Sequence, residues 1–180
     1  MTLSDFYDRC LRVDPSLSEG VLRALLTEAL EKVSLETGAP RLRVEASIGT
    51  TVITARIRRM LTVPDRVGAR NRELLWVDDP DEGTLTVANV REPFWLTFEL
   101  YPPVVPEDAT STDGQAFVVP FASTCLAYVL SGLYTDQERV GSARVQYARY
   151  QSGLIDVKRS VRDGADVRRL SATVDPAIWP

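Results

Sequence analysis

The spacing of apolar residues changes twice along this 180-residue chain, and that change most strongly limits what it can fold into. Between residues 19 and 37 apolar residues recur every three or four positions, which is typical of an amphipathic helix. Between residues 41 and 101 they alternate with polar residues, which is typical of half-buried strands. Helical spacing returns between residues 119 and 160. Helices before and after a group of strands predict an α+β fold.

The first part of the chain is predicted to form two helices. Residues 2–13 have the spacing of a short amphipathic helix. A longer helix follows a capping-box pattern at Ser16 and Glu19. Gly38 is suited to end that helix, and Pro40 prevents its continuation.

The last periodic part of the chain predicts an antiparallel helical hairpin over about residues 119–160. Pro120 is tolerated in the first turn of a helix, and Thr135 begins a second capping-box pattern that starts the next helix. The connection is so short that the two helices should pack against each other. The expected apolar seam of the second helix consists of Val140, Ala143, Tyr147, Tyr150, Leu154 and Val157. Gly153 lies in this helix and could permit a close approach or a bend.

The middle of the chain predicts a small, mostly antiparallel β-sheet over about residues 41–101. Residues 53–58 alternate as one strand. Two further runs, 74–77 and 84–87, flank a turn sequence and predict a hairpin. The tip of this hairpin is acidic and contains Asp78, Asp79, Asp81 and Glu82. We interpret it either as a solvated turn or as a functional patch.

The expected organisation is a single domain over residues 1–160 followed by an extended C-terminal arm over residues 161–180. The arm lacks a clear period. Trp179 near its end either folds back onto the domain or inserts into a neighbouring subunit, since tryptophan is a common anchor at protein interfaces.

The chain lacks the side chains that several common kinds of catalytic site require. The chain contains no histidine, which removes the commonest general acid or base. Its two cysteines, Cys10 and Cys125, lie on apolar helical stripes and are expected to be reduced core residues. No glycine-rich phosphate loop is present. We therefore expect a protein that is not an enzyme and has no cofactor or metal. A carboxylate-dependent metal enzyme, with its site at the acidic tip, is the alternative that ranks last. No signal peptide or membrane span is expected, so the chain should first fold in a cytoplasm.

Two clusters of basic residues stand out in a chain whose net charge is −4. Each is interpreted as a solvated face, as a docking surface for carboxylates, or as a nucleic-acid site, the last being disfavoured by the overall acidity. The first cluster contains Arg56, Arg58, Arg59, Arg66, Arg70 and Arg72, and the second contains Lys158, Arg159, Arg162, Arg168 and Arg169.

The order of these predicted elements resembles the head–tail connector (adaptor) proteins of tailed bacteriophages. The resemblance covers roughly residues 17–160 and is most specific in the helical hairpin. Residues 120–134, PFASTCLAYVLSGLY, look like the family's apolar helix that ends in a small residue, Leu and Tyr. The tyrosines along residues 138–154 look like those of its following helix. Residues 61–67, 74–77 and 83–87 are similar to the β-rich insert of some members.

This resemblance implies a structural virion protein that forms a homo-oligomeric ring, commonly dodecameric, below the portal. The ring would join capsid to tail at the neck, bind a stopper or tail protein, and extend a channel through which genomic DNA passes without specific binding. Assembly would take place in the host cytoplasm. Portal docking would fall to Arg168, Arg169, Leu170, Ile178 and Trp179 of the arm, and the acidic tip would face the channel or the distal ring. The alternatives are a stopper or tail-terminator neck protein, or an accessory protein that binds nucleic acid through its arginine clusters.

Overall fold

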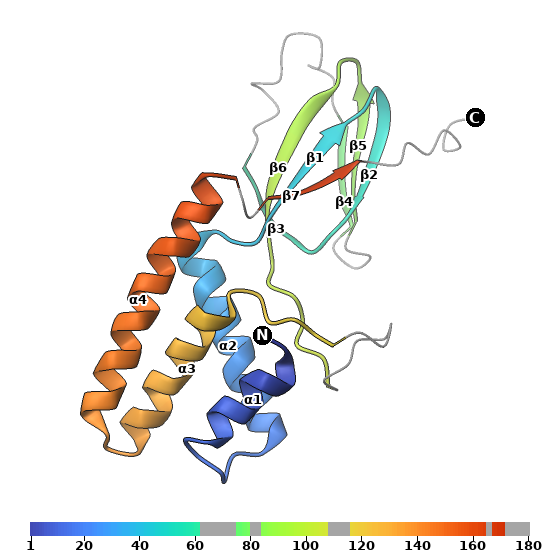
Figure 1. Ribbon diagram of the computed structural model, residues 1–180. Helices are drawn as coiled ribbons and strands as arrows, with labels where there is room; N and C mark the ends of the chain where they lie inside the picture. Colours follow the sequence, from blue (N-terminus) through green and yellow to red (C-terminus); the bar gives the residue numbers. More distant parts are fainter. Residues whose placement is uncertain (62–74, 80–83, 108–115, 165–166, 172–180) are drawn as a thin grey trace. The chain divides into compact units, whose positions relative to one another are not determined.

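The computed structural model describes residues 1–61, 75–79, 84–107, 116–164 and 167–171 (Figure 1). Within these ranges it contains four α-helices and seven β-strands. The α+β fold predicted from the periodicity is confirmed, as are the N-terminal helices, the mostly antiparallel strands and the C-terminal helical hairpin.

The chain divides into two compact units, where the sequence predicted one domain over residues 1–160. The helical unit comprises Met1–Ala39 and Pro102–Asp163, and the β unit comprises Pro40–Tyr101 and Gly164–Pro180. The physical reason is that the apolar residues of the helices and those of the strands form separate cores. The predicted arm over residues 161–180 is therefore divided between the two units. Residues 161–163 belong to the helical unit, and residues 164–180 belong to the β unit.

The helical unit contains α1 (Leu3–Leu11), α2 (Glu19–Thr37), α3 (Ala122–Asp136) and α4 (Val140–Arg162). Thr2 and Asp5 form a reciprocal capping box at the start of α1. The cap of α2 is Ser18, whose hydroxyl accepts from the Val21 amide, so the predicted cap at Ser16 is displaced by two residues. Gly38 ends α2 as predicted, in the left-handed conformation with φ 69°.

The hairpin formed by α3 and α4 is confirmed, but its connection differs from the predicted one. Thr135 lies inside α3 and its hydroxyl donates to the Ser131 carbonyl, a local bond that replaces the expected capping role. The N-terminal residue flanking α4 is Arg139, which makes no side-chain capping bond.

Helices α3 and α4 approach closely where Gly153 of α4 faces Thr124 of α3. A β-carbon added at Gly153 would collide with the Thr124 hydroxyl and lie 3.1 Å from its Cβ. The close approach considered for this glycine is thus present. Gly132 of α3 and Gly141 of α4 have nothing within 4 Å of such a β-carbon.

The core of the helical unit is apolar and includes both cysteines. Phe6, Leu26 and Val33 are fully buried. Cys10 and Cys125 are buried and free, as predicted. Burial raises the pKa of each thiol to about 12, because an apolar interior disfavours the thiolate. Tyr150 is 1% exposed and donates to a carboxylate oxygen of Glu36 at 3.0 Å, which keeps its buried hydroxyl satisfied.

The β unit contains two sheets. One has the strand order β3-β6-β1-β7 and the other β2-β5-β4. All pairs are antiparallel except β1 with β7. The strands are β1 (Arg41–Ala46), β2 (Gly49–Thr54), β3 (Ile57–Met60), β4 (Leu75–Asp79), β5 (Thr84–Val90), β6 (Phe94–Leu100) and β7 (Val167–Ser171).

Both sheets contribute to one core, in which Val44 of β1, Val87 of β5 and Phe98 of β6 are buried. The single strand predicted over residues 53–58 is instead interrupted at Ala55 and Arg56. Its two parts, β2 and β3, therefore belong to different sheets.

Strand β7 corrects part of the predicted arm. Residues 167–171 pair in parallel with β1, with Arg43 opposite Arg169. Arg168, Arg169 and Leu170 are therefore strand residues within the sheet, because their backbone groups complete the ladder of β1.

Candidate interaction surfaces

The four-stranded sheet carries an arginine stacked on an exposed tryptophan. The guanidinium carbon of Arg43 in β1 lies 4.6 Å from the ring centre of Trp95 in β6. Trp95 is 40% exposed. The pairing of Glu45 with Trp95 and of Arg43 with Thr97 places these side chains on one face. A planar cation on an open ring can contact carboxylates, backbone or nucleic-acid bases.

Further along β6, the carboxylate of Glu99 accepts two hydrogen bonds from Arg59 of β3. The distances are 2.8 Å from Nη2 and 3.1 Å from Nε. Glu99 is 7% exposed, whereas the Arg59 side chain is largely exposed. The hydrogen bonds and charge of Glu99 raise the pKa of Arg59 further. This fork stabilises the sheet, so Arg59 of the first basic cluster serves an internal contact.

Helix α4 exposes several apolar side chains. Val140, Val145, Tyr147 and Ile155 are each more than half exposed. The predicted seam was wrong for Val140 and Tyr147, because the buried stripe of α4 consists of Ala143, Tyr150, Leu154, Val157 and Val161.

Two of these exposed residues border a shallow cavity between α3 and α4. Its volume is about 340 Å³, and Val140, Ala143 and Tyr147 supply most of its apolar lining. Ser131 and Thr135 of α3 close the other side. We call the exposed residues Val140 and Tyr147, which border this cavity, the apolar face of α4.

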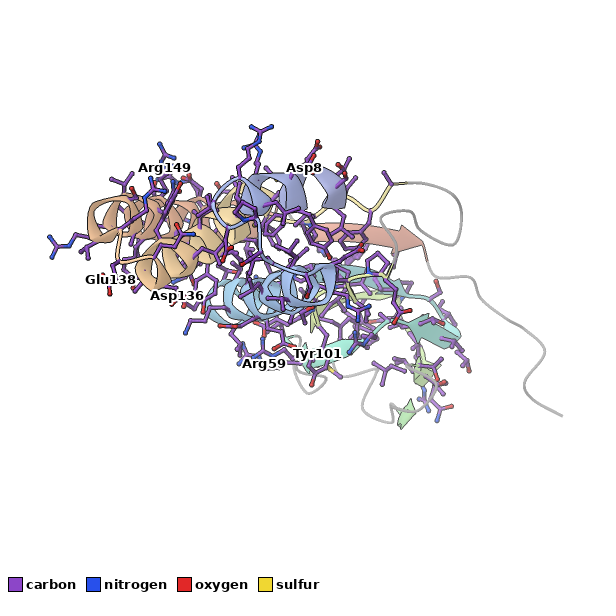
Figure 2. The ribbon with its side chains drawn as sticks, turned by 90° about the horizontal axis from the view of Figure 1, so that it is seen from below. Asp8, Arg59, Tyr101, Asp136, Glu138 and Arg149 are labelled. Carbon is purple, nitrogen blue, oxygen red and sulfur yellow. The ribbon has the colours of Figure 1, made fainter. Side chains whose placement is uncertain are left out.

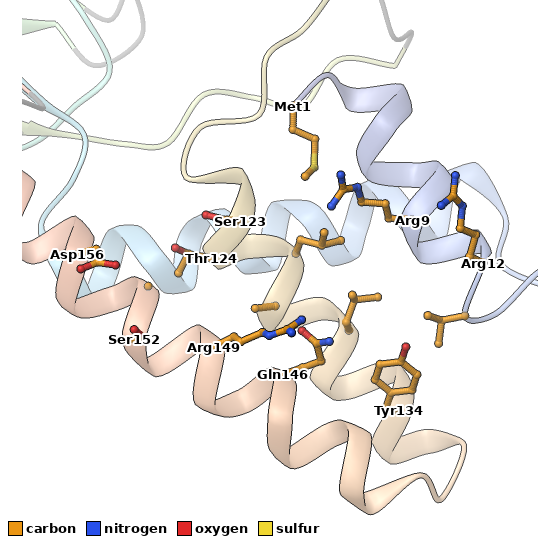
Figure 3. Close-up of a pocket in the computed structure, with 15 residues that line it drawn as sticks. Met1, Arg9, Arg12, Ser123, Thr124, Tyr134, Gln146, Arg149, Ser152 and Asp156 are labelled. Atoms are coloured by element: carbon orange, nitrogen blue, oxygen red, sulfur yellow. The ribbon is translucent and has the colours of Figure 1, made fainter.

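A larger cavity of about 620 Å³ lies among α1, α3 and α4 and is lined by three arginines (Figure 3). Arg9 comes from α1, Arg12 is the residue that caps the C-terminal end of α1, and Arg149 comes from α4. Within the described ranges, none of the three takes part in an ion pair. We call this cavity the arginine groove.

The rest of the groove combines apolar and hydroxyl-bearing side chains. Leu126 and Ala127 of α3 are buried beneath it. Gln146 and Ser152 of α4 offer neutral hydrogen-bonding groups, and Asp156 is the one carboxylate in the lining. Figure 3 shows Arg9 directed toward Met1 and Arg149 directed toward Gln146. The groove can therefore accept negative charge and a small apolar group together.

The residues predicted from the sequence to form sites are only partly described. Arg168, Arg169 and Leu170 lie in β7, and Asp78 and Asp79 end β4. Asp81, Glu82, Ile178 and Trp179 lie outside the described residues, as do Arg66, Arg70 and Arg72. Strands β7 and β4 occupy edges of different sheets.

The arginine groove was missed by sequence reasoning. Arg9 and Arg12 are three positions apart and share a helix face, but Arg149 is distant in the sequence. Each of the three arginines lies outside the apolar stripe of its own segment. That signal marks each arginine as a surface residue but does not indicate that the three share a groove.

The described residues hold no group of three or more Cys, Asp or Glu side chains placed to bind a metal ion. None of the described helices is both long enough and apolar enough to span a membrane.

Comparison of the chain with models of known protein families found no matching family, and comparison with curated proteins found no match.

Proposed function

We propose that this protein is a structural virion protein, a head-to-tail adaptor of a tailed bacteriophage. Copies of the chain form a ring below the portal, join capsid to tail and extend the DNA channel. The support from the sequence is the resemblance of the hairpin over residues 119–160 to that of adaptor proteins. This assignment places the protein in the virion neck, after assembly in the host cytoplasm.

The observation that carries the proposal is the apolar face of α4. One side of this helix is buried, with Tyr150 and Leu154 in the core of the helical unit. Four large apolar side chains of α4 are exposed to solvent, and two of them, Val140 and Tyr147, are seven positions apart and therefore lie on the same side of the helix. Both border the cavity between α3 and α4. Exposed apolar groups that lie together on a folded domain mark interaction sites, because leaving them in water is unfavourable. In a ring, each α4 would bury this face against a neighbouring copy.

The remaining contacts of the ring follow from the same assignment. The portal would bind the C-terminal segment, with Trp179 and Ile178 as apolar anchors and Arg168, Arg169 and Leu170 beside them. A stopper or tail protein would bind the opposite end of the ring. Genomic DNA would pass through without specific contacts, as expected of a chain with a net charge of −4.

Native mass spectrometry of the purified protein, alone and with a candidate portal, tests the proposal. We expect a ring on the portal. The double variant Val140→Asp/Tyr147→Asp should abolish the ring while circular dichroism stays unchanged. A matched control is Leu35→Asp on α2, since Leu35 is 61% exposed but lies outside the apolar face of α4. A wild-type chain that stays monomeric with every portal tested contradicts the proposal. Binding only to a preformed adaptor ring would instead identify a stopper or tail terminator.

A second candidate, a nucleic-acid-binding accessory protein, is favoured by one observation. Arg43 stacks on the exposed ring of Trp95, and Arg56 lies 5.6 Å from the ring centre of Tyr101. Aromatic rings beside arginines can stack on unpaired bases. A mobility shift with single-stranded DNA that weakens with salt and is lost in Arg43→Ala/Trp95→Ala would support this function. Unchanged migration at low salt excludes it.

A further inference from the structure

The adaptor function leaves the arginine groove without a role, although three arginines line it. Arg9, Arg12 and Arg149 are all exposed, and none is neutralised by a carboxylate within ion-pair distance in the described ranges. Three unneutralised guanidinium groups around one cavity repel one another. A bound anion would remove this repulsion and form forked hydrogen bonds with the arginines.

The lining favours a segment of protein over a nucleic acid. Leu126 and Ala127 form an apolar floor, which suits a side chain or a proline ring but not a phosphate. Two acids also lie close by. Asp156 lines the groove, and Asp8 of α1 is exposed and directly precedes Arg9 in the sequence. Figure 2 shows Asp8 and Arg149 toward one side of the helical unit and Asp136 and Glu138 toward the other. A long polyanion would meet the carboxylates of Asp8 and Asp156, which a short acidic segment can avoid.

One segment of the chain itself has the matching chemistry. Residues 78–82, with the sequence DDPDE, contain four carboxylates within five residues, and no other five-residue window contains as many. The segment also contains a proline for the apolar floor. Asp78 and Asp79 of this segment are the last residues of β4, where they pair with Leu85 and Thr84 of β5.

We propose that the arginine groove of one copy binds residues 78–82 of a second copy. The groove belongs to the helical unit and the acidic segment to the β unit, so the contact joins unlike units of two copies. Such a head-to-tail contact closes into a ring when its rotation permits. The inference rests on the proposed adaptor function and supplies a polar contact beside the apolar face of α4.

Charge exchange in the full-length protein tests this contact. Arg9→Glu/Arg149→Glu should weaken self-association by roughly tenfold or more, measured by analytical ultracentrifugation, because opposite charges become like charges. Asp79→Arg/Asp81→Arg should do the same. Combining all four substitutions in one chain should restore association. The control Lys158→Glu/Arg159→Glu makes the same change of charge at exposed positions of α4 outside the groove.

A peptide of residues 77–84 separates this inference from the adaptor function, because it can be tested on a monomer. Fluorescence anisotropy should detect binding of this peptide to the wild-type protein. Binding should be lost when the protein carries Arg9→Glu/Arg149→Glu. It should also be lost when the wild-type protein is given a peptide whose acids are replaced by amides.

Three results would overturn the inference. The first is a peptide that fails to bind while rings still form on the portal, which leaves the adaptor function standing. The second is loss of single-stranded DNA binding in the groove variant without rescue by charge exchange, which would make the groove a phosphate site. The third is charge exchange that alters the melting temperature of a strictly monomeric chain, which would place the segment in the groove of its own chain.

Discussion

The helical unit and the β unit use different chemistry on their surfaces. On α4 the helical unit exposes Val145 and Ile155, which have no polar group to satisfy. On its four-stranded sheet the β unit exposes arginines held by neighbours, as Arg59 is held by Glu99 and Arg43 by Trp95. The comparison teaches that the exposed apolar side chains of α4 remain free to be buried against a partner, whereas Arg43 and Arg59 of the four-stranded sheet are already held by contacts within the β unit.

The largest test of this comparison asks whether the two cores are energetically separate. Phe6 and Phe98 are both fully buried, one in each core. Phe6→Ala and Phe98→Ala should each lower the free energy of unfolding by about 3–5 kcal/mol, because each leaves a cavity. The loss should be confined to the unit that contains the substitution.

The chain provides a separate signal for each unit. Trp76, Trp95 and Trp179 all fall in the β unit, so tryptophan fluorescence follows that unit. All four helices of the described residues fall in the helical unit, so circular dichroism at helical wavelengths follows it. If Phe6→Ala shifts both transitions equally, the two units unfold as one and the comparison fails.

A second test concerns the contact between α3 and α4. Gly153→Ala should destabilise the helical unit by about 1–3 kcal/mol, because the new methyl group overlaps Thr124. Gly132→Ala is the matched control and should stabilise by up to about 1 kcal/mol, since its added methyl group meets open space. Urea denaturation followed by circular dichroism measures both. Equal effects of the two substitutions would show that the close approach is relaxed in solution.

A third test uses alkaline pH, to which the buried thiols of the helical unit should respond between pH 8 and pH 10. The pKa of Cys125 is raised to about 12 by burial, from 9.0. A group whose pKa is higher in the folded state gives stability that is complete below its unfolded pKa and is lost as pH rises toward the folded value.

The unfolding free energy should therefore fall by about 1 kcal/mol per thiol between pH 8 and pH 10. Denaturation of wild type and Cys125→Ala at both pH values measures this loss, which should be smaller in the variant. The fluorescence transition of the β unit should move less. An identical pH slope in the variant would mean that Cys125 ionises while the unit is folded.

The smallest expected effect is at Arg43. Arg43→Met keeps an apolar stem over Trp95 but removes the cation, so the β unit should lose only about 0.5–1 kcal/mol. Chemical denaturation followed by tryptophan fluorescence measures it. A loss above about 2 kcal/mol would mean that the exposed sheet face depends on this arginine far more than an open cation–π contact allows.

The sequence predicted those elements whose residues carry the pattern themselves. Leu22, Leu26 and Ala29 are spaced for one buried stripe and are buried. Leu42 and Val44 alternate with arginines and face the core of the β unit. These predictions succeed because burial on one face of an element imposes its own period.

The remainder depends on contacts between distant residues, which a local pattern does not encode. Strand β7 pairs with β1 across more than a hundred residues, and its VRRLS sequence lacks a clear alternation. The alternation runs on through Ala55 and Arg56, so it gave no sign that β2 and β3 join different sheets. The arginine groove has its lining on three helices. No single stretch of sequence brings Arg9 and Arg149 together.

The place of β7 has a consequence for how the protein is made on the ribosome. Its partner strand β1 is synthesised early, yet β7 follows α4 near the end of the chain. Until translation reaches residue 171, one side of β1 lacks its ladder partner, and such an edge can pair with a foreign strand. The last stretch of the nascent chain therefore decides when the sheet is protected, and a message truncated after α4 would release a polypeptide prone to aggregate.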